Sequence, residues 1–202
     1  MRKTIAALSL SCALLLPSLA QAEGGPGAID AFRKSHTEVT ALVDAKAETP
    51  KVQDRVDQLL DYDWIAQAAL GGPSKYSELC AERCDEFQAL LTKLIRKNYL
   101  KRIEDKNRGT VEYVAEHVRE KATKVDTKVT FKDKADGKTK TVSVDYVMHK
   151  VDGKWHVRDI ITEGVSLAKN YKYEINRLYA RGGMDEVITT LQKKLDSLEA
   201  ED

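Results

Sequence analysis

The four histidines are the first residues whose chemistry could define a site. They are His36, His117, His149 and His156. His149 and His156 flank the turn sequence Asp152-Gly153, so they would face each other across a hairpin. Two imidazoles without a third ligand make a poor zinc site. The pattern therefore predicts solvated histidines and no metal centre.

Ser166 is the candidate nucleophile. The segment Gly164-Val165-Ser166-Leu167-Ala168 begins like the nucleophile elbow G-x-S-x-G but lacks its closing glycine. A serine that precedes a helical pattern is typical of a helix N-cap, and we expect that role here. The chain also has no phosphate-binding loop, dinucleotide fingerprint or H-E-x-x-H motif. The sequence predicts no catalytic residue and no cofactor, and a hydrolase that uses Ser166 with a histidine is kept as a third hypothesis.

Cys80 and Cys84 form a C-x3-C pair. This spacing is a weak metal signal without a second pair of ligands, and it differs from the C-x-x-C of redox enzymes. In an oxidising compartment we expect the two cysteines to form a local structural disulfide, with free thiols as the alternative.

Residues 1–22 have the features of a cleavable secretory signal. A positively charged start precedes an apolar run from Ile5 to Leu16, which is too short to span a bilayer. Ala20-Gln21-Ala22 is a small-x-small cleavage sequence. We expect cleavage after Ala22, a soluble product outside the cytoplasm, and one mature domain over residues 23–202.

Composition and charge exclude two classes of protein. Lys and Arg number 33 against 32 Asp and Glu, so bulk positive charge cannot drive nucleic-acid binding. Apolar residues make up 42% of the chain, which is too much for an acidic disordered protein. The sequence is that of a folded domain, and we expect no nucleic-acid partner.

Apolar residues repeat at spacings of three and four in the first half of the mature chain, which indicates amphipathic helices. Thr49-Pro50 is a helix start, with the hydroxyl at the N-cap and the proline at N1. Asp61 or Asp63 would cap a short helix, and Gly71-Gly72-Pro73 would end it. The expected helices cover residues 29–43, a segment from residue 50, residues 64–70 and residues 87–99.

Apolar and polar residues alternate after Asn107-Arg108-Gly109, which indicates strands with one buried face. Asp136-Gly137 and Asp152-Gly153 are turn signals between them. Helical spacing returns after Gly164 and breaks at Gly182-Gly183. The order predicts an α+β fold: a twisted antiparallel sheet of about four strands wrapped by N- and C-terminal helices.

The apolar face of such a sheet must be covered by the helices. If the helices pack tightly, the face is an ordinary core; if they stand off, an apolar cavity remains. Periodicity does not distinguish the two arrangements. Tyr113, Tyr146 and Tyr171 favour a cavity, because rings with a polar end suit a pocket mouth.

Three spaced motifs resemble those of the MlaC, or toluene-tolerance, family. Residues 61–71 (DYDWIAQAALG) resemble the family's F-D-F-x-x-I-A-x-x-A-L-G segment. Residues 155–171 resemble its W-x-V-x-D-x-x-x-E-G-V-S-L-x-x-N-Y pattern, and residues 182–191 also fit. The similarity runs in order over about residues 29–198.

The resemblance implies a monomeric periplasmic lipid carrier with an apolar lipid cavity between its sheet and helices. Such a carrier passes phospholipid between an inner-membrane ABC transporter with an MCE subunit and an outer-membrane lipoprotein–porin complex. A carrier of a hopanoid-type lipid and a periplasmic interaction module without a ligand are kept as alternatives.

The predicted tail contacts are inward-facing strand residues and two residues of the following helix. They are Val129, Val142, Val144, Tyr146, Met148, Val157, Leu167 and Tyr171. A structural corner between the last strand and that helix is expected from Trp155, Asp159, Glu163, Gly164 and Asn170. We expect Gly164 to allow a close backbone approach there, and the carboxylates to accept nearby amide hydrogens.

Overall fold

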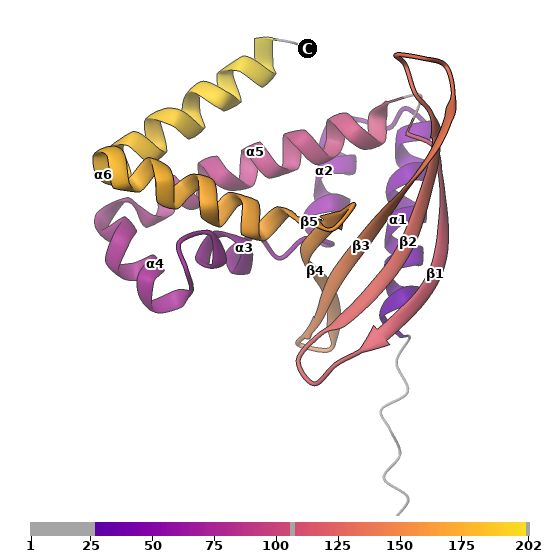
Figure 1. The fold of residues 1–202 in the computed structure, drawn as a ribbon, viewed down its shortest axis with the longest axis horizontal. Coiled ribbons are helices and arrows are strands. Elements are labelled where there is room, and N and C mark those ends of the chain that lie inside the picture. The colour runs from indigo at the N-terminus through magenta and orange to yellow at the C-terminus, as the bar shows by residue number, and fades with distance from the viewer. Residues whose placement is uncertain (1–26, 106–107, 201–202) are drawn as a thin grey trace, which may run out of the picture.

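The computed structural model describes residues 27–105 and 108–200, and the predicted signal segment lies outside them. Figure 1 shows helices on one side of a curved sheet, with the C-terminal helix folded back over the others. The elements follow the predicted order of helices, strands and helices. They are α1 (Ala28–Asp44), α2 (Thr49–Asp57), α3 (Tyr62–Ala69), α4 (Pro73–Cys80), η1 (Ala81–Arg83), α5 (Cys84–Glu104), β1 (Thr110–Val118), β2 (Thr123–Lys132), β3 (Thr139–Val151), β4 (Lys154–Thr162), β5 (Val165–Ser166) and α6 (Leu167–Ala200).

The starts of α2 and α3 follow local capping chemistry. The Asp61 side chain accepts a hydrogen bond from the Trp64 backbone amide at 3.1 Å, so Asp61 rather than Asp63 caps α3. Pro50 lies in the first turn of α2, where its missing amide hydrogen costs nothing. Thr49 is already helical, and Glu48 occupies the N-cap position predicted for Thr49.

The short helix α4 was not predicted, because its eight residues hold too few apolar side chains for a clear period. It begins at Pro73 and ends at Cys80, where Ala81 takes a positive φ of 45°. Cys80 and Cys84 are joined by a disulfide that links the end of α4 to the start of α5. The bond therefore holds together two helices that meet at a sharp bend.

The five strands form one antiparallel sheet in the order β1-β2-β3-β4-β5. The sequence predicted about four strands. The additional strand, β5, has only two residues. Val151 pairs with Lys154 around Asp152 and Gly153, whose φ angles are both positive, and this is the two-residue hairpin that the sequence predicted. The same register places His149 opposite His156.

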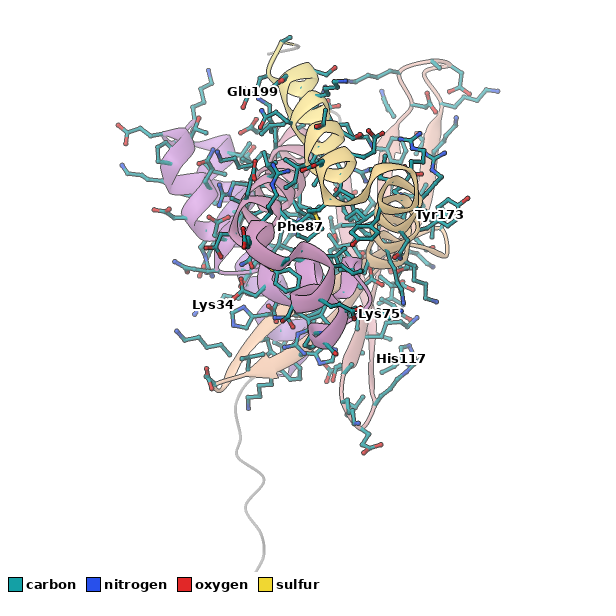
Figure 2. The ribbon with its side chains drawn as sticks, turned by 90° about the vertical axis from the view of Figure 1, so that its left-hand side faces the viewer. Lys34, Lys75, Phe87, His117, Tyr173 and Glu199 are labelled. Atoms are coloured by element: carbon teal, nitrogen blue, oxygen red, sulfur yellow. A yellow bond between two sulfur atoms is a disulfide. The ribbon has the colours of Figure 1, made fainter. Side chains whose placement is uncertain are left out.

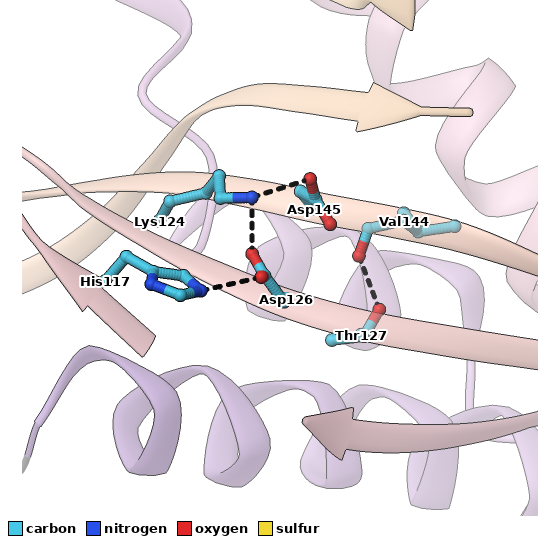
Figure 3. Close-up of polar contacts among 6 residues, drawn as sticks. All are labelled: His117, Lys124, Asp126, Thr127, Val144 and Asp145. Atoms are coloured by element: carbon cyan, nitrogen blue, oxygen red, sulfur yellow. Dashed lines mark hydrogen bonds and ion pairs between the residues drawn. The ribbon is translucent and has the colours of Figure 1, made fainter. Parts of the chain in front are cut away.

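A cluster of charged side chains lies on the outer face of the sheet (Figure 3). The Lys124 ammonium lies 2.8 Å from Asp126 and 3.1 Å from Asp145, and the second Asp126 oxygen contacts His117 at 2.8 Å. On the opposite face, the buried Thr127 hydroxyl donates to the Val144 carbonyl at 2.6 Å. The alternation therefore leaves one face for solvent and one for the helices.

The corner between β4 and α6 is held by Asp159. Its two oxygens accept hydrogen bonds from the Ser166 hydroxyl at 2.6 Å and the Ala168 amide at 2.9 Å. The Ser166 hydroxyl oxygen in turn accepts from the Lys169 amide at 3.1 Å, as an N-cap does. Ser166 is thus the helix-start residue that the sequence predicted.

Gly164 has a different role at this corner from the one expected. A Cβ placed on Gly164 would meet nothing within 4 Å, so no close backbone approach requires glycine. Instead Glu163 and Gly164 both have positive φ, 48° and 79°, and form a tight two-residue turn between Thr162 and Val165. Glycine is favoured because it adopts this conformation without a steric penalty.

The helix α6 is divided by a sharp kink at Gly182-Gly183, where the sequence predicted a break. Gly183 has φ 65° and ψ −156°, a region that is open almost only to glycine. Figure 1 shows the two halves of α6 meeting at this point and the second half turning back above α5. Apolar residues of both halves and of α5, including the fully buried Phe87 (Figure 2), form the helical core.

Candidate functional site

A cavity of about 1290 Å³ lies between the inner face of the sheet and the helices. Its wall includes residues of α1, α3, α5 and α6 and of all five strands. Pockets for small molecules are typically 300–1,000 Å³, so this space exceeds the usual range. The helices therefore stand off from part of the sheet and do not close it into a solid core.

The sheet and the helices meet at one end of this space. The backbone between α2 and α3 runs beside β4, where the Asp61 amide donates to the Val157 carbonyl at 3.0 Å. The Val157 amide donates to the Leu59 carbonyl at 2.8 Å. These two bonds fix the chain to the sheet at the closed end of the cavity.

The structure brings together seven of the eight predicted tail contacts. Met148 is the exception, because it is fully buried at the closed end of the sheet and is absent from the cavity wall. It has the predicted inward orientation, but the helices cover this part of β3 directly. The residues that do line the cavity are Val129, Val142, Val144, Tyr146, Val157, Leu167 and Tyr171.

Three polar residues of α5 line the cavity and were missed by the sequence analysis or counted as core. They are Asn98, Tyr99 and Arg102. Ile95, Asn98 and Arg102 are spaced by three and four, so polar residues continue the apolar stripe of α5. This interruption was the available signal that the helix faces something other than a core.

Four tyrosines place their rings in the cavity wall: Tyr99, Tyr113, Tyr146 and Tyr171. Burial raises the pKa of Tyr171 to about 12, and it raises the pKa values of Tyr99 and Tyr146 further. The Tyr146 ring packs on Phe32 of α1, with centroids 3.9 Å apart. All four phenols are therefore neutral at physiological pH and are able to donate a hydrogen bond.

One of the tyrosine hydroxyls has a protein partner. The Tyr113 oxygen lies 2.8 Å from His36 Nδ1. Burial, together with the nearby Arg108, lowers the pKa of His36. His36 is therefore neutral at pH 7, and it orients Tyr113 in the wall.

Basic side chains lie at the wide end of the cavity. Arg102 of α5 and Lys194 of α6 are exposed and line it, and Arg108 lines it while paired with Asp44. The cavity thus combines an apolar interior along the sheet with a cationic margin between α5 and α6.

The hydrolase that the sequence analysis kept as a third hypothesis would need Ser166 beside a histidine. Ser166 contacts Asp159 and backbone amides, and its hydroxyl has no hydrogen bond to a histidine among residues 27–105 and 108–200. His149 Nδ1 lies 3.2 Å from Arg158, and burial followed by the Arg158 charge lowers the pKa of His149. In the part of the chain that is described, no three His, Cys, Asp or Glu side chains form a group that could hold a metal ion.

None of the described helices is both long and apolar enough to cross a membrane.

The comparisons with solved structures show the fold. A phospholipid-binding protein from Ralstonia solanacearum, solved in complex with a phospholipid, aligns with a TM-score of 0.70 at 21% identity. The alignment covers 86% of this chain and 99% of that one.

A second structure, a putative calcium/calmodulin-dependent protein kinase II association domain from Xanthomonas campestris, aligns with a TM-score of only 0.22. Its identity is 16%, over 50% of this chain and 79% of that one, and it says nothing about the fold. No curated protein sequence matches the chain. The sequence profile of the MlaC protein family matches residues 33–193, and the chain therefore belongs to the MlaC family.

Proposed function

We propose that this protein is a lipid carrier that holds the acyl chains of a phospholipid in its cavity. The single observation that carries the proposal is the 1290 Å³ space that the apolar face of the sheet lines. The Ralstonia solanacearum protein, which shares the fold, was solved with a phospholipid bound. The predicted tail contacts that line the cavity are the surface against which the chains would lie.

The physical need for such a cavity is large. Each methylene exposed to water costs about 0.8 kcal/mol, so a diacyl lipid of roughly thirty methylenes does not cross an aqueous space unaided. A carrier replaces water with an apolar wall. It needs no nucleotide of its own, because the direction of transfer is set by its partners.

The cellular setting is part of the proposal. After loss of the signal segment 1–22, residues 23–202 act as one periplasmic lipid-binding domain and a monomer. The carrier exchanges lipid with an inner-membrane ABC transporter that contains an MCE subunit, and with an outer-membrane lipoprotein–porin complex. It is not an enzyme, and phospholipid is its cargo rather than a cofactor.

Solvent extraction of the purified protein followed by mass spectrometry tests the proposal. We expect phospholipid at up to one molecule per chain. A hopanoid or another polycyclic lipid in its place would support the carrier function but identify a different cargo. A preparation without any lipid, which also fails to take phospholipid from vesicles, would contradict the proposal and favour an interaction module.

A matched pair of variants tests whether the cavity is the site. Val144→Glu puts a carboxylate into the cavity wall, and we expect loss of bound lipid because a charge in an apolar site is strongly disfavoured. Val118→Glu makes the same change at a side chain that is 76% exposed, and lipid should be retained. Equal lipid content in folded preparations of both would refute the site.

A further inference from the structure

The cavity contains more polar groups than a wall for hydrocarbon tails needs. Tyr99 and Arg102 come from α5, Tyr113 and Tyr146 from β1 and β3, and Tyr171 from α6. Three separate parts of the fold thus bring hydrogen-bond donors to one space. This convergence has no role in binding methylene groups, which form no hydrogen bonds.

The Tyr146 hydroxyl is the most informative of these groups. The residue is only 8% exposed and lines the cavity. Its hydroxyl forms no hydrogen bond with any residue that the structure describes, and the same holds for Tyr99. The Tyr146 oxygen is not sealed from the cavity, so an acceptor that enters from outside the protein can take its hydrogen bond at this position.

Arg102 supplies the charge that matches such an acceptor. Its side chain lines the cavity, and its charge is felt by both Tyr146 and Tyr171. No carboxylate within the described ranges forms an ion pair with it, whereas the neighbouring Arg108 is paired with Asp44. A guanidinium is well suited to phosphate oxygens, because its planar donors match their geometry.

We propose that Tyr99 and Tyr146 in the cavity wall and Arg102 at the cavity margin form a polar subsite that binds the ester and phosphate oxygens of a glycerophospholipid. The inference rests on the proposed function and deepens it. The phenols donate to the ester carbonyl oxygens and Arg102 binds the phosphodiester, while the acyl chains lie along the sheet. The glycerol part of the lipid is thus drawn between α5 and the strands.

A competition assay with two ligands separates this subsite from the tail-binding wall. Delipidated protein is loaded with 1-N-phenylnaphthylamine, an apolar fluorescent probe without an ester or a phosphate. Dioleoylphosphatidylglycerol then displaces it. In Tyr99→Phe/Tyr146→Phe and in Arg102→Gln the affinity for the probe is measured first, and the affinity for the lipid is compared with it in each variant. The lipid should bind about tenfold more weakly in each variant, which is the effect of losing one or two hydrogen bonds or one charged contact.

Two control variants make the same chemical changes outside the cavity. Tyr173→Phe removes a hydroxyl from a side chain that is 67% exposed on α6 and points outward in Figure 2. Arg119→Gln removes a guanidinium from the exposed β1–β2 connection. From both control variants, the lipid should displace the probe at the same concentration as from the unchanged protein.

Unfolding in urea distinguishes a binding role of the Tyr146 hydroxyl from a structural one, because only a structural role would make its removal lower the stability. Because the Tyr146 hydroxyl has no protein partner, Tyr146→Phe should leave the empty protein as stable as before or more stable, while its lipid affinity falls. A less stable Tyr146→Phe protein with unchanged lipid affinity would overturn the subsite.

The two proposals fail in different ways. If the unchanged protein binds neither the probe nor the lipid, the carrier function itself is wrong. If it binds both and the phenylalanine and glutamine variants do the same with equal affinity, the carrier stands and the polar subsite is wrong. Displacement of the probe by oleate is the last comparison. If Arg102→Gln weakens displacement by oleate as much as displacement by the phospholipid, the subsite binds any anionic lipid oxygen. That result would overturn its preference for a glycerophospholipid.

Discussion

Ser166 shows how one side chain joins two elements. It donates to Asp159 and accepts from the Lys169 amide, so it fixes the end of β4 to the start of α6. Replacement by alanine should lower the free energy of unfolding by about 1 kcal/mol, the usual value of an N-cap. Urea unfolding measures this difference. Ser77→Ala, on the exposed surface of α4, is the control and should change stability by less than half as much.

His36 should make stability depend on pH. Its pKa in the folded protein is lowered, chiefly by burial, so the unfolded chain binds a proton more readily. Stability is therefore complete above the unfolded pKa of about 6.5 and falls as the pH drops through that value. Urea midpoints at pH 8 and pH 5.5 measure the effect.

The matched variants for this pH effect are His36→Gln and Lys34→Gln. Glutamine at position 36 removes the titrating group, so the loss of stability between pH 8 and pH 5.5 should be smaller. Lys34 is an exposed neighbour on α1 (Figure 2), and its replacement should leave the loss as it was. Equal pH dependence of the His36→Gln and unchanged proteins would contradict the assignment.

At the scale of single residues, the sequence predicted those roles that depend on local contacts. The cap at Asp61, the helix start at Ser166 and the facing of His149 and His156 depend on a few neighbouring residues. Arg102 could not be assigned in the same way, because its role depends on β3 and α6, which are distant in sequence.

Gly183 controls the direction of the second half of α6. Its φ of 65° with ψ of −156° is strained for any residue with a Cβ, so Gly183→Ala should cost about 1–3 kcal/mol of stability. Urea unfolding again provides the measurement. Lys193→Ala, at an exposed position of the same half, is the control and should have little effect. A variant as stable as the unchanged protein would show that the kink is not needed.

The disulfide acts at the same scale, between α4 and α5. Its loop is short, so reduction should lower stability by about 2 kcal/mol at most. Comparing urea unfolding with and without a reductant tests this, and Cys80→Ser/Cys84→Ser should be insensitive to the reductant. A loss well above that limit would mean that the bond does more than close a loop.

Elements in which apolar residues repeat regularly were predictable, whereas α4, where the repeat is weak, was not. The strands β1 to β4 and the helix α5 repeat their apolar residues often enough to be recognised. The eight residues of α4 do not, and its position follows from contacts with α5 and η1 that only the folded chain provides. The kink in α6 was predictable because two consecutive glycines mark it.

The whole molecule should be more stable with lipid than without it. A ligand that binds only the folded state at 100 times its Kd adds about 2.7 kcal/mol. For a chain of this length that corresponds to a rise in Tm of roughly 5–10 °C. Thermal unfolding before and after extraction measures it. Val144→Glu, which should hold no lipid, should show no change on extraction.

The cavity itself is a property of the whole molecule, and this is why alternation alone did not establish it. Val144 and Met148 have the same period and face the same side of β3, yet one lines open space and the other is fully covered. The difference arises from where the segment around Leu60 meets β4. Only the complete arrangement of helices decides which inward residue remains uncovered.

The cavity wall runs from His36 in the first helix to Leu198 near the end of the last one. No shorter piece of the chain therefore encloses a finished compartment. A chain that is synthesised from its N-terminus gains its final wall only when the last turns have been made. Connectivity alone then prevents premature loading, and a truncated chain would present an open apolar trough that favours aggregation.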